Sequence, residues 1–283
     1  MLTKQFSIQL MSQADISIAI AWAAAEGWNP GLRDAECFYT ADPTGFWMGL
    51  LDEEPIATIS AVKYGSSFGF IGFYIVKPEY RGQGYGMQLW NAALATLTGR
   101  NIGLDGVLAQ QQNYQKSGFQ LAHRNIRYEG VCGGERVDSE DLMELSTIKF
   151  ETVATYDRAF FPDDRIQFLQ SWINQPNCTA LGILQDGILA GYGVLRACYN
   201  GHKIGPLFAD QPAFAETLFL ALKSTAEAGS PLYLDVPETN RTAVNLAEKY
   251  GMKMVFETAR MYTQTCPDLP CDRWYGVTTF ELG

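Results

Sequence analysis

The sequence predicts an α/β fold built from two copies of one unit, each a sheet flanked by helices. An apolar run at residues 68–76 leads through a glycine-rich loop into a helical pattern, with apolar residues at three- and four-residue spacing. A second, short helical pattern ends at Gly118, where Phe119 opens another apolar stretch. Similar segments recur at a constant offset in the second half of the chain. These three observations indicate a strand–loop–helix unit that occurs twice.

The glycine-rich loop between residues 76 and 86 has the features of an anion-binding site. Its glycines let the backbone approach a ligand closely, and the first N–H groups of the following helix are unpaired. The helix dipole adds partial positive charge there, so the loop predicts a phosphate or pyrophosphate ligand. Two common phosphate motifs do not fit. The Gly-Lys-Ser/Thr end of a P-loop is missing, and the last glycine of a dinucleotide fingerprint would fall on Met87.

The loop instead matches the pattern Arg/Gln-x-x-Gly-x-Gly/Ala, with Arg81, Gly84 and Gly86 in the defined places. Downstream, residues 113–119 read Asn-Tyr-Gln-Lys-Ser-Gly-Phe, and Tyr114 lies one helical turn before Gly118. Both segments resemble motifs of the GCN5-related N-acetyltransferases, the GNAT family. The resemblance covers essentially residues 1–130.

This resemblance implies a twisted, mostly antiparallel sheet whose fourth and fifth strands splay apart, and acetyl-CoA as the co-substrate. It implies that the pantetheine arm pairs with the exposed edge of the fourth strand and that the loop holds the pyrophosphate. The implied cofactor-binding residues are Phe73, Tyr74, Ile75, Val76, Arg81, Gly82, Gln83, Gly84, Tyr85, Gly86 and Asn113.

The resemblance also implies direct acetyl transfer to an amine in a ternary complex, without a covalent enzyme intermediate. A backbone N–H near Val76 would polarise the thioester carbonyl. Tyr114 would be the general acid, since a tyrosine hydroxyl is protonated at neutral pH. The general base is left open between Asp105, Glu26 and a chain of water molecules. Aromatic residues in the first 50 positions could line the acceptor pocket.

The repeat divides the chain into two predicted domains. Residues 51, 71 and 118 correspond to residues 184, 204 and 251, always at the same offset. We expect a GNAT N-acyltransferase domain at residues 1–130, a linker at 131–141 and a GNAT-like domain at 142–283. The second copy has no glycine between residues 206 and 228, has Asp210 near the start of its helix, and has Ala247 where the first copy has Tyr114. It is therefore predicted to be degenerate.

Composition narrows the function classes further. The 283 residues carry a net charge of −10 without a basic cluster, so nucleic acid is not an expected partner. Six scattered cysteines and two histidines disfavour a metal site and fit reduced thiols in the cytoplasm. The apolar stretch near the start is interrupted by Gln13 and Asp15, so we expect no targeting segment, and no run is long enough to span a membrane.

The leading hypothesis is an acetyl-CoA-dependent N-acetyltransferase acting on a primary amine of a small molecule. The alternative is a non-catalytic acyl-CoA-binding or regulatory protein whose C-terminal domain docks a partner. A generic nucleotide-binding domain is disfavoured by the two missing fingerprints. The amine, the length of the acyl group and a possible homo-oligomer stay open.

Overall fold

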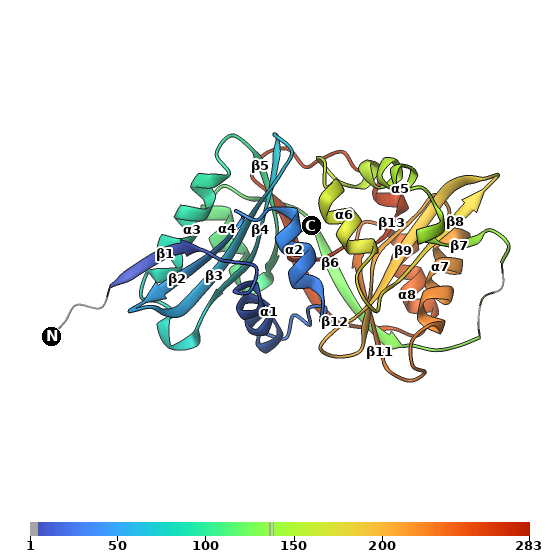
Figure 1. Ribbon diagram of the computed structural model, residues 1–283, viewed down its shortest axis with the longest axis horizontal. Helices are drawn as coiled ribbons and strands as arrows, with labels where there is room; N and C mark the ends of the chain where they lie inside the picture. Colours follow the sequence, from blue (N-terminus) through green and yellow to red (C-terminus); the bar gives the residue numbers. More distant parts are fainter. Residues whose placement is uncertain (1–4, 136, 138) are drawn as a thin grey trace.

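The computed structural model describes residues 5–135, 137 and 139–283 (Figure 1). The first half of the described chain has the strands β1 (Phe6–Leu10), β2 (Phe46–Leu51), β3 (Glu54–Tyr64), β4 (Phe68–Val76), β5 (Asn101–Val107) and β6 (Gln120–Val131). Its helices are α1 (Ile16–Ala25), α2 (Asp34–Ala41), α3 (Tyr85–Thr96) and α4 (Gln111–Lys116), with short 3₁₀ helices η1 (Pro78–Tyr80) and η2 (Leu108–Gln110).

The second half repeats this order of elements. Its strands are β7 (Leu142–Glu144), β8 (Thr179–Gln185), β9 (Ile188–Ala197), β10 (His202–Ala209), β11 (Pro231–Pro237), β12 (Lys253–Tyr262) and the additional β13 (Trp274–Gly276). Its helices are α5 (Phe150–Asp157), α6 (Ile166–Ile173), α7 (Pro212–Ser224) and α8 (Arg241–Lys249), with η3 (Leu145–Thr147), η4 (Arg158–Phe160) and η5 (Cys271–Arg273). The strands β6 and β12 begin at equivalent positions of the repeat, as the constant offset predicts.

All these strands join one continuous sheet in the order β1-β2-β3-β4-β5-β12-β6-β11-β10-β9-β8-β7, with β13 paired to β10. The pairs β4–β5 and β10–β11 are parallel and the remaining pairs are antiparallel. The predicted mixed α/β fold with a mostly antiparallel sheet is confirmed.

The two halves exchange their sixth strands. In the first half, the fifth strand β5 pairs with β12, the sixth strand of the second half. In the second half, the fifth strand β11 pairs with β6, the sixth strand of the first half. The strands β6 and β12 also pair with each other in the middle of the sheet. One sheet therefore contains strands from both predicted domains. The domain boundaries at residues 130 and 142 stay predictions. Residues 136 and 138 of the predicted linker lie outside the described residues.

Local sequence explains the hairpins of both halves. Asp52 and Glu53, between β2 and β3, have φ of 51° and 67°. Asp186 and Gly187, between β8 and β9, have φ of 52° and 77°. Positive φ at both central residues is the geometry of a two-residue hairpin turn that matches the twist of the strands, and aspartate and glycine tolerate it best. A two-residue turn of this kind therefore joins the strands of each hairpin.

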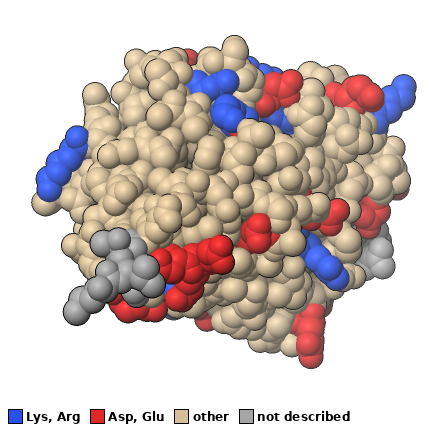
Figure 2. Space-filling view, turned by 60° about the vertical axis from the view of Figure 1, so that its left-hand side comes forward, with Lys and Arg blue, Asp and Glu red and all other residues tan. Residues whose placement is uncertain are grey.

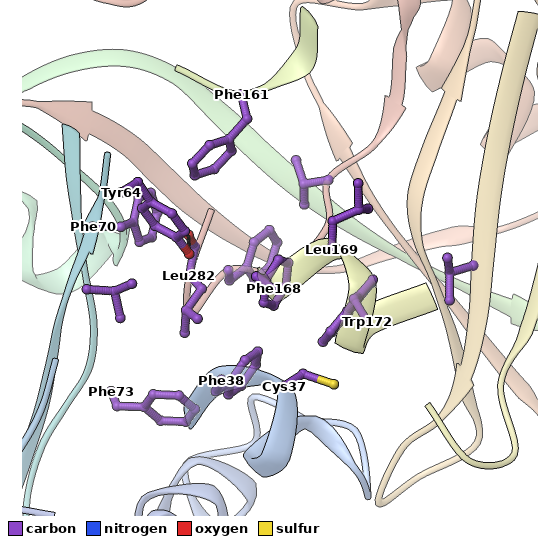
Figure 3. Packing of buried hydrophobic residues seen from close by; sticks show 14 of the residues in the cluster. Cys37, Phe38, Tyr64, Phe70, Phe73, Phe161, Phe168, Leu169, Trp172 and Leu282 are labelled. Atoms are coloured by element: carbon purple, nitrogen blue, oxygen red, sulfur yellow. Dashed lines mark hydrogen bonds between the residues drawn. The ribbon is translucent and has the colours of Figure 1, made fainter. Parts of the chain in front are cut away.

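An aromatic core joins the two halves (Figure 3). Phe38 of α2 stacks on Trp172 of α6, with ring centroids 5.9 Å apart, and also contacts Phe73 of β4 at 5.6 Å. Phe168 of α6 stacks on the same Trp172 at 5.0 Å. These rings are almost completely buried, and large buried aromatic surfaces dominate the energetics of cores and interfaces. The halves are thus held together by packing as well as by strand exchange.

No helix among the described residues is long and apolar enough to cross a membrane. The face in Figure 2 is mostly uncharged, and its Lys and Arg side chains lie in small separate groups. The absence of a nucleic-acid partner stays a prediction.

Candidate active site

A cavity of about 530 Å³ lies where β4 and β5 separate. The two strands pair from Phe68 to Ile71 and from Asn101 to Leu104, and the pairing ends there. Beyond Ile71, β4 has no strand partner on its β5 side among the described residues. The cavity is lined by β4 residues 71–76, β5 residues 104–107, the glycine-rich loop and helix α4. The predicted splay of the fourth and fifth strands is therefore present, with an open backbone edge beside the cavity.

A bulge bends β4 beside the cavity. The register between β3 and β4 shifts between Thr58 and Ser60, and Phe73 has a φ of 47°. The Thr58 hydroxyl donates a hydrogen bond of 2.8 Å to the Phe73 carbonyl oxygen. A positive φ is costly for phenylalanine, and such strain collects where a backbone must be re-aimed. The bulge directs the backbone of residues 73–76 along the cavity wall.

The glycine-rich loop forms the outer end of the cavity. Helix α3 starts after Gly84, which has a φ of 86°, and Gly82 has a φ of 74°. A Cβ at either position would meet no atom within 4 Å, so glycine is required here by the backbone conformation and not by crowding. Gly82, Gly84 and Gly86 line the cavity at the start of α3. This arrangement suits an anion at the N-terminus of the helix.

Not every predicted loop contact reaches the cavity. Gln83 and Tyr85 do not line it. The Gln83 side chain donates to the Glu79 carbonyl oxygen at 2.8 Å, and the Tyr85 ring packs on Phe6 at 5.0 Å. The side chains of these two residues support the loop, whereas Arg81 and Asn113 line the cavity.

Tyr114 lies on α4, with its ring packed between Gly106 and Trp90. A Cβ on Gly106 would come within 2.2 Å of the Tyr114 ring, so only glycine leaves room for that ring on β5. The centroids of the Tyr114 and Trp90 rings are 5.7 Å apart. Burial, with a smaller contribution from Tyr74, raises the pKa of Tyr114 to about 12. The hydroxyl is therefore protonated at neutral pH and can donate a proton.

The two carboxylates predicted as general bases are both paired. The side chain of Asp105 is buried and accepts hydrogen bonds of 2.9 and 2.6 Å from Arg260 and one of 2.8 Å from Asn125. Glu26 forms an ion pair of 2.5 Å with Arg81, which also donates to the Val76 carbonyl oxygen. Both residues line the cavity. Their roles as bases stay untested predictions, and these pairings weigh against them.

Comparison with known proteins gives the family. Residues 15–119 match the acetyltransferase (GNAT) family, and residues 153–276 match an acetyltransferase (GNAT) domain. The chain is 30% identical over 264 residues to the holothin acyltransferase of Pseudoalteromonas sp. (strain SANK 73390), covering 93% of this chain and 89% of that protein. The chain belongs to the GNAT family.

Solved structures agree with this fold. A Pyrococcus horikoshii protein matches 100% of the chain and 98% of its own length, with a TM-score of 0.83 at 24% identity. A tandem GNAT protein from the clavulanic acid biosynthesis pathway covers 93% of this chain and 100% of its own, with a TM-score of 0.61 at 13% identity. The two GNAT matches and the acyltransferase relative make the protein a tandem GNAT acyltransferase, and the non-catalytic alternative is set aside.

The second GNAT copy has its slot filled by the chain itself. Strands β10 and β11 pair only from His202 to Ile204. Beyond that point β13 pairs with β10, and the N–H of Val277 donates to the Asp235 carbonyl oxygen on β11 at 2.8 Å. In addition, Pro206 is the repeat equivalent of Phe73, and proline has no backbone N–H. The second copy, which lacks the glycine-rich loop and the tyrosine, thus also has the slot between β10 and β11 filled by β13 and Val277.

The sequence suggested that the second copy walls the acceptor slot of the first, but it did not reveal which residues of the second copy line that cavity. Four lining residues come from beyond residue 250: Phe256, Thr258, Phe280 and Glu281. Glu281 is only 3% exposed. Residues 274–283 carry no motif and have no counterpart in the repeat, so no signal in the sequence marked them.

Proposed function

We propose that the enzyme transfers the acetyl group of acetyl-CoA to a primary amine of a small molecule, by direct attack in a ternary complex. The observation that carries the proposal is the position of Tyr114 across the splay from the β4 bulge, on the same cavity as the glycine loop. Acceptor and donor must share about 530 Å³, which favours a small acceptor.

The residues present fit acetyl-CoA as a substrate. The loop at Gly82 and Gly84 offers open space at the start of a twelve-residue helix, and the edge of β4 beyond Ile71 is free for an extended arm. When bound, acetyl-CoA supplies the acyl group already activated as a thioester. A panel of acyl-CoA donors of increasing chain length would test whether the enzyme prefers a longer acyl group.

Different groups of this chain would assist the separate steps of the transfer. Backbone N–H groups near Val76 would stabilise negative charge on the carbonyl oxygen. The Tyr114 hydroxyl would protonate the departing sulfur, a contribution typically worth ~10²–10⁴-fold. The buried aromatic surroundings of the cavity would exclude water from competing hydrolysis.

The test is thiol release from acetyl-CoA in the presence of small primary amines, polyamines, amino acids and aminoglycosides, with the product identified by mass spectrometry. We expect thiol release that depends on the amine and matches the amide formed. Binding of CoA without acceleration by any amine would contradict the proposal.

A further inference from the structure

Residues 277–283 connect the slot of the second copy to the active site of the first. They follow β13, and a Cβ on Gly205 would lie 2.6 Å from the carbonyl oxygen of Thr278. A Cβ on Gly72 would lie 2.0 Å from the carbonyl oxygen of Glu281. Gly72 and Gly205 are equivalent positions of the repeat. The segment therefore packs directly against β4 and β10, the fourth strands of the two halves. Only glycine leaves room for it at Gly72 and Gly205.

The contacts at Gly72 place Glu281 at the wall of the cavity next to the β4 bulge. The Tyr64 hydroxyl donates to the Leu282 carbonyl oxygen at 3.0 Å, and the side chain of Leu282 is buried in the aromatic core (Figure 3). Because the segment is anchored on both sides of Glu281, the position of this residue is defined by the core and not by a free end.

The Glu281 carboxylate is incompletely satisfied. One oxygen, Oε2, accepts a hydrogen bond from the Thr279 hydroxyl. The other, Oε1, is buried and has no hydrogen-bond partner, and no Lys or Arg nitrogen lies within 4 Å of the carboxylate among the described residues. Buried carboxylate oxygens are nearly always paired in proteins. A donor supplied by a ligand would complete this one.

The nearby cations form no ion pair with Glu281, although Nη1 and Nη2 of Arg196 are buried without a hydrogen-bond partner. Arg127 and Arg196 are close enough to act on Glu281 electrostatically. Arg127 nevertheless pairs with Asp235 at 2.7 Å, and Arg196 pairs with Asp34 at 3.0 Å. Glu281 therefore lines, without an ion-pair partner, a cavity that has to receive an amine.

Aromatic rings surround the same part of the cavity. Phe280 and Phe256 line it with centroids 6.4 Å apart, and Trp28 lines it from the first half. The Arg127 guanidinium lies over Phe280 at 4.9 Å and donates to the Trp28 backbone carbonyl oxygen at 2.6 Å, so it contacts residues from both halves at this wall. Flat rings next to a carboxylate suit a ligand with a flat body and a cationic or N–H donor group.

We propose that Glu281, a residue of the second copy, binds the acceptor amine in the active site of the first copy, and that the acceptor is a compact primary amine on a planar ring. This inference rests on the proposed amine acetylation. It makes the active site composite, so that the degenerate copy supplies the acceptor subsite.

The same contact accounts for the protons. An ammonium gives one proton to Oε1 of Glu281, and the freed lone pair forms the C–N bond while the C–S bond breaks. The leaving sulfur takes the proton of the Tyr114 hydroxyl, and the new amide nitrogen returns its surplus proton to Tyr114. Glu281 then loses its proton to solvent, so each turnover releases one proton.

The test uses the full chain and the variant Glu281→Gln, which keeps the shape and removes the charge. Glu257→Gln is the matched control, because Glu257 belongs to the second half, pairs with Arg124 at 3.0 Å and does not line the cavity. Calorimetry measures binding of benzylamine to protein saturated with CoA, where no turnover occurs. Steady-state kinetics with acetyl-CoA compare benzylamine, cyclohexylmethylamine and spermidine.

We expect Glu281→Gln to weaken benzylamine binding and to lower kcat/KM for it by about 10- to 100-fold, the usual effect of losing a hydrogen bond to a charged group. CoA affinity should be unchanged, and Glu257→Gln should match the wild type. Equal benzylamine binding in wild type and Glu281→Gln would overturn the role of Glu281. Preference of the wild type for spermidine or cyclohexylmethylamine would overturn the planar acceptor.

A second measurement covers the case in which the variant does not fold. In the wild type, benzylamine should bind at least about 10-fold more tightly than benzyl alcohol, which has the same ring without the ammonium. Equal affinities would overturn the proposal. Failure of the wild type to bind CoA, or to acetylate any amine, would instead remove the proposed function on which this inference rests.

Discussion

Arg260 and Asp105 lie directly opposite each other on β12 and β5, and their side chains form two hydrogen bonds of 2.9 and 2.6 Å. The same relationship occurs once more in the sheet. Arg127 on β6, the repeat equivalent of Arg260, lies opposite Asp235 on β11 with hydrogen bonds of 2.7 and 2.8 Å. Each exchanged strand thus carries an arginine that pairs with an aspartate on the fifth strand of the other half. Since the degenerate copy also contains this Arg–Asp pair, we infer that the pair stabilises the fold and does not take part in catalysis.

The first prediction concerns this pair. Asp105→Asn should lower the free energy of unfolding by about 3–5 kcal/mol, because it leaves the buried charge of Arg260 without its partner. Asp235→Asn should have a similar effect. Denaturant unfolding of both variants measures this. Under conditions where Asp105→Asn is folded it should still acetylate; loss of turnover in a fully folded variant would restore Asp105 as a candidate base.

The second prediction concerns the proton donor. Tyr114→Phe keeps the ring against Gly106 and Trp90 and removes only the hydroxyl. We expect kcat to fall by about 10-fold or more with little change in the affinity for CoA, as for a lost acid catalyst. Steady-state kinetics and calorimetry measure the two quantities. Turnover equal to that of the wild type would show that the tyrosine serves packing alone.

The third prediction concerns the loop. Gly84→Asp places a negative charge at the start of α3 and should abolish stabilisation by CoA, which is ~2.7 kcal/mol at a hundredfold excess over Kd. Gly229→Asp is the matched control, because Gly229 has a φ of 85° and equally open space but lies in the second half. Thermal unfolding with and without CoA separates strain from lost binding. A CoA-induced shift that persists in Gly84→Asp would show that the pyrophosphate binds elsewhere.

The fourth prediction concerns stoichiometry. Since β13 and the N–H of Val277 occupy the slot between β10 and β11, we expect one acetyl-CoA per chain. Calorimetric titration with CoA measures the number of sites. Two sites of comparable affinity would mean that β13 can leave its slot and that the second copy still binds the cofactor.

The fifth prediction concerns pH and stability. Burial, aided by the charge of Arg260, lowers the pKa of His123 from 6.5 to about 4. The unfolded chain therefore binds a proton between these values that the folded chain does not, so stability falls as the pH drops from about 6.5 to about 4. The loss amounts to about 3 kcal/mol. Unfolding of the wild type and of His123→Gln across this range measures the difference, and identical pH dependence would contradict the shift.

The sequence by itself determined the features that depend on local spacing. The run from Arg81 to Gly86 and the position of Tyr114 before Gly118 indicated the family, because a few neighbouring residues set the conformation of a loop and the face of a helix. The constant offset between similar segments indicated two copies of one unit, since each copy must contain the same turns and strands in the same order.

Only the tertiary structure decided which strands pair and which residues complete the site. Nothing local distinguishes a β6 strand that stays in its own half from one that pairs with β11, because strand pairing depends on partners far away in the chain. The pairing of Asp105 with Arg260 and the arrival of Glu281 beside Gly72 follow from that exchange and from the path of residues 277–283. Contacts of this kind depend on how distant segments pack together, and therefore no short pattern in the chain encodes them.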